Sequence, residues 1–202
     1  MRYDARNQEA IKYLHPAAAH KAWQALEELA FVGEDALLSG FRTNEEQAKK
    51  YAQGRTEPGI IVTNAKPGWS FHNYGLAFDL VPVGPLGIPL EKRTRLEWAA
   101  GARYDTYGRL LQAIGFQWGF QLWGYDKPHF QYTQGLTIEE VRANKRPDAT
   151  RARAERLAAL QDRLDDAMTA LQKPWMQRYG MQKRKAHLEE FVVTMQERIK
   201  GI

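Results

Sequence analysis

Two residues of metal-binding type, His72 and Asp79, lie in one short stretch of the sequence. The apolar residues that continue past Asp79 predict a buried strand, which would hold this carboxylate in a fixed place. Imidazole nitrogen and carboxylate oxygen are ordinary Zn²⁺ ligands, and a catalytic zinc usually has three protein ligands and an open fourth position. His129, further along the chain, begins a run that alternates enough for a second strand. We therefore expect His72, Asp79 and His129 to form a metal site.

A second carboxylate, Asp126, precedes His129 by three residues and is separated from it by Pro128. At that position a carboxylate could lie beside the metal without binding it. There it could accept a proton from water that the metal activates. On sequence alone, a simple turn role in the Asp-Lys-Pro bend suits this residue equally well. Asp126 is therefore a candidate general base, with the turn as the alternative.

Arg42 and Ser70 are two further polar residues expected close to the proposed ligands. Residues 36–41 fit a short strand, and a capping box that begins at Thr43 starts a helix, so Arg42 would lie at the strand end. On sequence alone, a surface ion pair is the simpler role for Arg42. For Ser70 we expect a hydrogen bond to a ligand residue or to substrate, because no His-Asp pair is free to activate it as a nucleophile.

Four motifs follow one another along the chain: SGFRT from Ser39, YAQGRT from Tyr51, SFHNYGLAFD from Ser70 and DKPH from Asp126. Together they resemble the zinc DD-peptidase family, and the similarity spans about residues 6–141. That family includes D-Ala-D-Ala carboxypeptidases, D-Ala-D-Ala dipeptidases and the L-alanyl-D-glutamate endopeptidases of phage lysins and bacterial wall hydrolases. The first two motifs are similar to the upstream signature of the endopeptidase branch.

The resemblance implies a zinc peptidase whose Zn²⁺ is held by His72, Asp79 and His129. It also favours a catalytic role for Arg42, which would stabilise the negative charge that develops on the substrate carbonyl. A fixed guanidinium is suited to that task. In the same way, the resemblance assigns Asp126 as the general base that carries the proton between water and leaving amine.

Substrate contacts are expected from Ser70, Arg42 and Trp123, although a place in the core suits Trp123 equally well. Relatives carry a Gly-Gly-Asp-aromatic segment where this chain has residues 118–124, a change that leaves the ligands untouched but alters the wall of the substrate site. We expect cleavage of the L-Ala–D-Glu bond in the peptide stem of peptidoglycan, as by phage endolysins. D-Ala-D-Ala carboxypeptidase activity is one alternative. A catalytically inactive wall-binding module with a structural zinc is another.

The composition predicts a globular protein with a hydrophobic core. The chain has 202 residues, of which 44% are hydrophobic, enough for one domain of ordinary size with an appendage. It contains no cysteine, which excludes disulfides and thiolate zinc sites. No apolar run approaches the length of about 18 residues needed for a membrane helix, and the N-terminus lacks a secretory signal. We expect a monomer made in the cytoplasm that acts on the cell wall after release, with no nucleic-acid partner.

Charge divides the chain into two parts. Residues 1–141 carry 15 Lys+Arg and 16 Asp+Glu, a net of −1, whereas residues 142–202 carry 14 and 8, a net of +6. A boundary near Pro147 gives a catalytic domain of residues 1–144 and a basic helical segment of residues 145–202. The expected fold is α+β, with a small antiparallel sheet that carries the zinc site, packed with helices, and a C-terminal helical pair.

Two apolar stripes at helical spacing predict this C-terminal pair. The first contains Leu157, Leu160, Leu164, Met168 and Leu171, and the second contains Leu188, Phe191, Val192, Met195 and Ile199. Packing of the two helices on each other or on the catalytic domain is the simpler role. The alternative is that their basic surface, including residues 183–185, binds an anionic envelope surface such as wall polymer or lipid headgroups.

Overall fold

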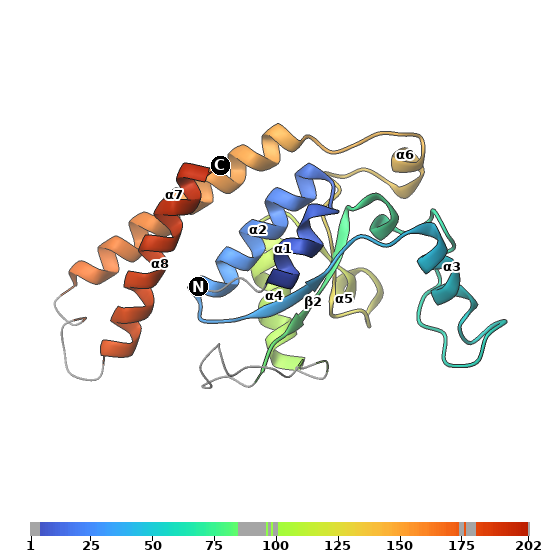
Figure 1. The fold of residues 1–202 in the computed structure, drawn as a ribbon, viewed down its shortest axis with the longest axis horizontal. Coiled ribbons are helices and arrows are strands. Elements are labelled where there is room, and N and C mark those ends of the chain that lie inside the picture. The colour runs from blue at the N-terminus through green and yellow to red at the C-terminus, as the bar shows by residue number, and fades with distance from the viewer. Residues whose placement is uncertain are drawn as a thin grey trace.

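A four-stranded antiparallel sheet flanked by helices organises the chain (Figure 1), which confirms the α+β fold expected from the sequence. The computed structural model describes residues 5–84, 96, 98, 101–173, 176 and 181–201. The strands are β1 Ala36–Ser39, β2 Ala77–Pro82, β3 Gln117–Trp118 and β4 His129–Gln131. The helices are α1 Ala5–Lys12, α2 Pro16–Phe31, α3 Asn44–Ala52, the 3-10 turn η1 Phe71–Tyr74, α4 Gly101–Ala113, α5 Gly119–Trp123, α6 Ile138–Arg142, α7 Ala149–Gln172 and α8 Gln182–Gly201.

The two strands that carry proposed ligands are neighbours in this sheet. The strand order is β1-β2-β4-β3, and every neighbouring pair is antiparallel. Asp79 lies directly opposite His129, and Phe78 lies opposite Phe130. Because side chains alternate between the two faces of a strand, Asp79 and His129 share one face and the two phenylalanines share the other. The sheet register therefore sets two of the three proposed ligands side by side.

The phenylalanine face of the sheet packs into the main hydrophobic core. The rings of Phe78, Phe116 and Phe130 have centroids 5.0 to 6.4 Å apart, and each residue is at most 4% exposed. Helix α4 packs on this side of the sheet, where Gly108 meets Trp118. A Cβ at Gly108 would come within 2.5 Å of the indole ring, so this close approach of helix and sheet requires glycine.

Side chains cap the first turns of several helices, including the helix start expected at Thr43. Thr43 caps α3 and Thr137 caps α6, and in both cases a glutamate in the first turn reaches back to the backbone of the cap residue. Pro16 occupies the first turn of α2, and the side chain of His15 caps that helix. Because α3 begins directly after Thr43, Arg42 lies in the short connection between β1 and α3.

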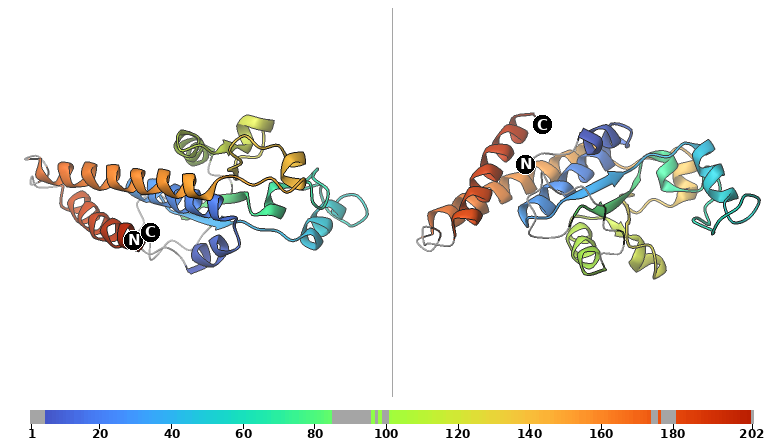
Figure 2. Two further views of the ribbon diagram at one scale, coloured as in Figure 1. Left: turned by 90° about the horizontal axis from the view of Figure 1, so that it is seen from above. Right: turned by 60° about the horizontal axis from the view of Figure 1, so that its bottom comes forward.

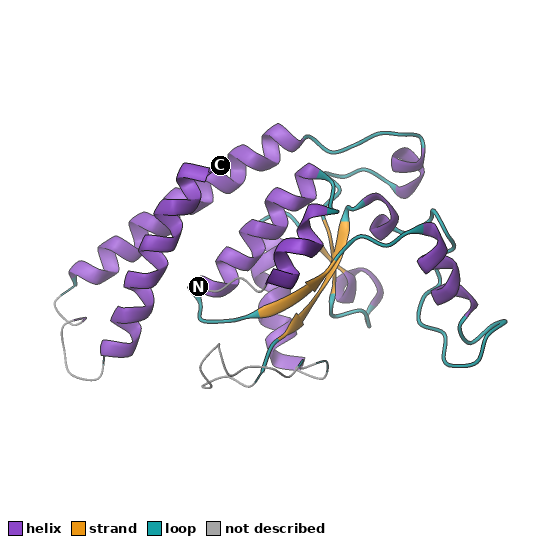
Figure 3. Ribbon diagram, in the orientation of Figure 1, coloured by secondary structure: helices purple, strands orange, loops and turns teal. Residues whose placement is uncertain are grey.

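A long irregular segment between α3 and η1 extends away from the sheet (Figure 3). Its base is tied to α3 by Gln47, which donates to the backbone O of Ala65 at 2.7 Å. Arg55 braces the middle of the segment by donating to the backbone O of Thr63 at 3.0 Å. The segment also exposes three consecutive apolar residues, Ile60, Ile61 and Val62.

Helices α7 and α8 form the C-terminal pair, and α7 packs along α2 (Figure 2). Ion pairs join α2 to α7: Lys21 with Glu155 at 2.7 Å, Glu27 with Arg156 at 2.6 Å, and Glu28 with Arg163 at 2.9 Å. The apolar sides of the pair form a second hydrophobic cluster, against which Phe31 of α2 packs: Leu160, Leu164, Ala167, Met176, Leu188, Phe191 and Met195. The two helices are therefore packed both on each other and on α2.

Two residues of the expected α7 stripe, Leu157 and Met168, lie instead on its outer side and are 39% and 42% exposed. The stripe that packs is narrower than the sequence pattern suggested. Across the described parts of the chain, no helix combines the length and apolar character needed to cross a bilayer. The division into residues 1–144 and 145–202 stays a prediction.

Candidate active site

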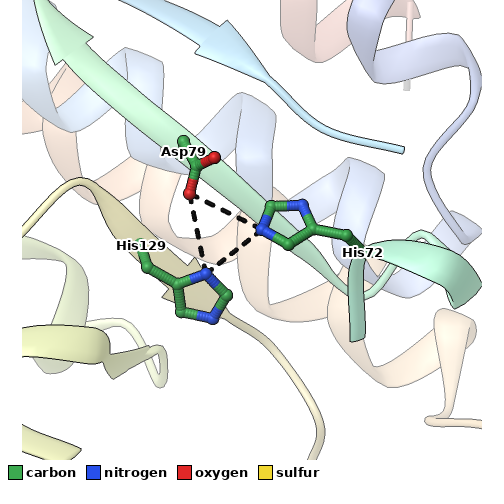
Figure 4. A group of neighbouring side chains, drawn as sticks. All are labelled: His72, Asp79 and His129. Atoms are coloured by element: carbon green, nitrogen blue, oxygen red, sulfur yellow. Dashed lines mark hydrogen bonds and ion pairs between the residues drawn. The ribbon is translucent and has the colours of Figure 1, made fainter. Parts of the chain in front are cut away.

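His72, Asp79 and His129, here called the metal cluster, come together from three separate elements (Figure 4). Nε2 of His72 lies 3.2 Å from Nδ1 of His129. Oδ1 of Asp79 lies 3.5 Å from the first of these nitrogens and 3.6 Å from the second. Both histidines are buried, and Asp79 is partly buried. Each residue therefore directs one donor atom at a common centre.

The 3-10 turn η1 carries His72 to this centre. Ser70 caps the turn, and its Oγ accepts the backbone N–H of His72 at 3.4 Å. The side chain of Asn73 accepts the backbone N–H of Ser70 and donates to the backbone O of Arg42 at 2.9 Å, which ties the turn to the connection between β1 and α3. Gly75 ends the turn at a φ of 65°, a left-handed conformation that glycine adopts readily.

The outer nitrogens of both imidazoles are held by carbonyl oxygens. Nδ1 of His72 lies 2.8 Å from the backbone O of Gly40. Nε2 of His129 lies 3.1 Å from Oε1 of Gln131, whose amide nitrogen donates to Gln117. Because a carbonyl oxygen can only accept, each outer nitrogen carries the ring proton in the neutral imidazole. The two inner nitrogens therefore present lone pairs to each other.

Three acceptor atoms that face one another require a positive charge between them, and their spacing fits Zn²⁺. At Zn–N distances of about 2.0–2.1 Å, two ligands of a tetrahedral site are about 3.3–3.4 Å apart. The three separations in the metal cluster, 3.2, 3.5 and 3.6 Å, lie close to that value. Two imidazoles and one carboxylate also make a three-ligand set of the catalytic type, which leaves a fourth position open.

Asp79 favours positive charge at the centre of the metal cluster. Burial by itself raises the pKa of Asp79, but the two neighbouring histidines outweigh this effect and hold the pKa below its usual range. Burial lowers the pKa of His129, but the hydrogen bond and charge of Asp79 outweigh it and raise that pKa overall. The opposite shifts are those of a carboxylate and an imidazole that stabilise each other's charged forms.

Arg42 lies beside the second carboxylate oxygen of Asp79, with Nη2 3.7 Å from Oδ2. Its Nη1 donates to Oε1 of Gln47 at 2.9 Å, and Gln47 is fully buried. A guanidinium that is fixed through one of its nitrogens keeps other N–H groups for a substrate oxygen. The structure therefore brings Arg42 to the edge of the metal cluster.

Asp126 lies in the turn before β4, and its carboxylate accepts the backbone N–H of His129. Burial is the largest influence on the pKa of Asp126 and raises it. The charge of His129 lowers this pKa and that of Asp79 raises it, and the net shift is upward. Asp126 is not among the three converging donors. A partly buried carboxylate next to a metal site but outside its ligand set has the properties of a proton carrier.

Trp123 ends α5 and lies over His129, with the two ring centroids 5.1 Å apart. It is 47% exposed, so the alternative of a core position is wrong for this residue. Trp118 takes the core position instead, stacked on Phe130. The exposed indole therefore forms part of the rim around the metal cluster.

Known proteins similar to this chain share the segment that holds these residues. A family model described as D-alanyl-D-alanine carboxypeptidase matches residues 63–132, which include the metal cluster and Asp126. Peptidoglycan L-alanyl-D-glutamate endopeptidase CwlK of Bacillus subtilis (strain 168) is 33% identical in an alignment over 129 residues that covers 58% of this chain and 72% of CwlK. The chain belongs to peptidase family M15. This family is one of zinc-dependent metallopeptidases, in agreement with the metal cluster.

Solved structures give a more distant likeness for this M15 peptidase. L,D-carboxypeptidase DacB from Streptococcus pneumonia is 23% identical, with 67% of this chain and 80% of DacB covered and a TM-score of 0.37. A likeness at this TM-score carries no information about the site. The family match also leaves out Arg42 and the helices α7 and α8, which lie outside residues 63–132.

Sequence reasoning missed the residues that hold the ligands of this M15 site in place. Gln131 could have been found, because it follows His129 by two residues and side chains two apart share a strand face. Gln47 could not be singled out among the polar residues of α3. The contact between Gly40 and His72 joins two elements whose packing the local pattern does not determine. These supports depend on tertiary structure.

Proposed function

We propose that this M15 peptidase hydrolyses the L-Ala–D-Glu bond in the peptide stem of peptidoglycan. The observation that carries the proposal is the metal cluster, which fits Zn²⁺ and has a guanidinium and a non-ligand carboxylate beside it. The similarity to CwlK, whose name states that activity, supports this choice of bond. The description of the matching family model supports a second candidate, D-Ala-D-Ala carboxypeptidase activity.

Each residue of the site has a distinct task in this proposal. His72, Asp79 and His129 would hold Zn²⁺, whose chemistry is to polarise a peptide carbonyl and lower the pKa of a water molecule. Arg42 donates to the carbonyl oxygen as negative charge develops on it. Asp126 accepts the proton of the attacking water and transfers it to the leaving amine, so that the peptide bond breaks with a neutral leaving group.

Digestion of purified muropeptides by the zinc-loaded protein, followed by mass spectrometry of the new termini, tests the choice of bond. Cleavage between L-Ala and D-Glu leaves L-Ala on the sugar and releases a peptide that begins with D-Glu. Carboxypeptidase activity would instead shorten a pentapeptide stem by its last D-Ala. If no muropeptide is cleaved, the peptidase proposal fails and a wall-binding module with a structural zinc becomes the better account.

We further propose that the protein acts as an endolysin of the phage type, made in the cytoplasm and released onto the wall. The similarity of its motifs to those of phage lysins supports this. In this proposal residues 1–144 form the catalytic domain, and residues 145–202 attract an anionic envelope surface through exposed charges such as Lys183 and Arg184 of α8. Salt screens such attraction over about 8 Å at physiological ionic strength. Binding of the full chain to whole envelopes should therefore weaken as salt rises, and salt-independent binding would contradict this part.

A further inference from the structure

Two exposed aromatic rings lie next to each other at the rim of the metal cluster. Trp123 is 47% exposed and Tyr125 is 69% exposed. Their centroids are 6.4 Å apart with an angle of 30° between the ring planes. This separation is near the upper limit for aromatic pairs, so each ring leaves much of its surface uncovered. Adjacent exposed apolar rings beside a catalytic site are typical of a binding surface.

The inner ring is fixed against the metal cluster. Trp123 lies over His129, and Gly119 makes room for this arrangement. A Cβ on Gly119 would come within 2.6 Å of a backbone oxygen, 2.9 Å of the Cβ of His129 and 3.1 Å of the Trp123 ring. Helix α5 then ends at Gly124, whose left-handed φ of 81° turns the chain into Tyr125. The same turn therefore presents both rings and leads into the strand of His129.

The substrate of the proposed function contains one group that suits such rings. The peptide stem consists of alanine, glutamate and a diamino acid, and none of these has a flat apolar surface. The muramyl sugar to which L-Ala is joined does have one, because the axial C–H bonds of its pyranose ring form an apolar face bordered by polar groups. Tryptophan and tyrosine likewise combine a flat apolar face with a polar edge.

The muramyl sugar also lies at a suitable distance from the bond to be cut. Between the scissile carbonyl of L-Ala and the sugar lie one amino acid and one lactyl group, which span about 7 Å when extended. The Trp123 ring lies 5.1 Å from the ring of the proposed ligand His129. We propose that Trp123 and Tyr125 form a stacking platform for the muramyl ring, so that the enzyme prefers peptide stems still attached to glycan. This inference rests on the proposed function, because it takes L-Ala–D-Glu as the bond held at the metal.

Two other exposed aromatic residues near the site are less suited to this task. Trp69 is 42% exposed, but the guanidinium of Arg142 lies over its face, 3.7 Å from the ring centroid. Phe41 is 43% exposed and stands next to Arg42 two residues after β1, the strand on the opposite side of β2 from the strand of His129. Phe41 therefore serves as a comparison that tests which side of the site receives the sugar.

The test compares two substrates with the same peptide. One is a GlcNAc-MurNAc tetrapeptide, and the other is an N-propionyl tetrapeptide, which keeps an acylated L-Ala but lacks the sugar. We expect the zinc-loaded wild-type protein to cleave the first with a kcat/KM about tenfold higher, as loss of an aromatic contact of this kind allows. Trp123→Ala should bring the ratio of the two kcat/KM values close to one, and Tyr125→Ala should lower it in part. Trp123→Phe and Tyr125→Phe keep a flat ring and should keep most of the preference.

Leu122→Ala and Phe41→Ala are the matched controls. Leu122 is 42% exposed on the same helix as Trp123 but has no ring, whereas Phe41 has a ring but stands beside Arg42. Both variants should retain the wild-type preference for the sugar-bearing substrate. Equal cleavage of the two substrates by the wild type would overturn the platform while leaving the proposed function in place. If Trp123→Ala and Tyr125→Ala both still prefer the sugar-bearing substrate, the platform is likewise overturned and the proposed function remains in place.

Binding of the expected product, GlcNAc-MurNAc-L-Ala, separates the platform from peptidase activity. In NMR titrations of the zinc-loaded protein, we expect this product to bind about tenfold more weakly to Trp123→Ala than to the wild type. If no muropeptide is cleaved but product binding depends on Trp123, the proposed function fails and the platform stands. If product binding is the same in wild type and Trp123→Ala, the platform is wrong.

Discussion

Two buried groups of charged side chains join distant parts of this chain, and their hydrogen bonding differs in kind. Where α2 meets α7 and α8, Glu27 accepts from Arg156 at 2.6 Å and from Arg198 at 2.8 Å. We call these three residues the Glu27 cluster. Here guanidinium donors meet a carboxylate acceptor, so the negative charge of Glu27 is compensated by the protein itself. In the metal cluster, by contrast, three acceptor atoms face one another across 3.2 to 3.6 Å.

The contrast shows what distinguishes a site from a structural contact in this fold. Burial does not distinguish the two clusters, because both lie in the interior and both include residues exposed by less than 10%. The direction of the outer hydrogen bonds distinguishes them, because the imidazole ring protons of the metal cluster are donated to Gly40 and Gln131. The metal cluster leaves three acceptor atoms facing the place where a cation would bind, whereas in the Glu27 cluster the donors already meet their acceptor.

The largest effect is expected from the carboxylate beside the metal cluster. Asp126→Ala should lower kcat about 10²–10⁴-fold, because it removes the group that transfers the proton. Zinc content should stay at the wild-type level, since Asp126 is not one of the converging donors. Steady-state kinetics on muropeptides and metal analysis of the same preparation measure both quantities. A fully active Asp126→Ala enzyme would show that another group carries the proton.

A substitution in the Glu27 cluster should lower the stability of the fold and leave the zinc content unchanged. Glu27→Ala leaves the guanidinium groups of Arg156 and Arg198 without their shared carboxylate, and loss of one partner from a buried ion pair costs about 3–5 kcal/mol. Denaturant unfolding should show this loss of stability, while zinc content remains normal. Glu9→Ala breaks an exposed ion pair with Lys12 and is the control that should change stability little. Zinc loss in a folded Glu27→Ala protein would mean that the two clusters are coupled.

The elements around the site were readable from the sequence because local signals determine them. The capping residue Thr43 starts its helix where the pattern placed it, and the apolar run around Asp79 indicated its strand. The His-Asp-His grouping was also expected in full, and the structure brings all three residues to one centre. These features depend on short-range spacing and on the motif resemblance.

Contacts between elements far apart in the chain could not be predicted from the sequence. The placement of β4 between β2 and β3 and the contact of His72 with the Gly40 carbonyl both depend on packing between separate elements. The pairing of Glu27 with Arg156, two residues far apart in the chain, gives no local signal either. Binary pattern can indicate that α7 has an apolar side, but not that the partner on that side is α2.

A smaller effect is expected from the support of one ligand. Gln131→Leu removes the acceptor that fixes the ring proton of His129, and loss of such a partner lowers metal affinity about 10–100-fold. Gln196→Leu, on the exposed side of α8, is the matched control and should leave affinity unchanged. Competition with a chelator of known affinity measures both variants. Equal zinc affinities for the wild type and Gln131→Leu would show that Gln131 does not support the metal ligand His129.

The central claim, that His72, Asp79 and His129 are completed by a metal ion, is tested most directly by metal stoichiometry. Zinc per chain should be measured in the wild type, in alanine variants of these three residues, and in His15→Ala, His20→Ala and His187→Ala. Two of these other histidines have contacts outside the cluster: His15 caps α2, and His187 lies against the backbone O of Ala30.

We expect about one Zn²⁺ per chain in the wild type and in the three control variants. Each variant of the metal cluster should lose most of its zinc, since a three-ligand site has no spare member. Retention of stoichiometric zinc by Asp79→Ala, or its loss from His187→Ala in a folded protein, would contradict the assignment.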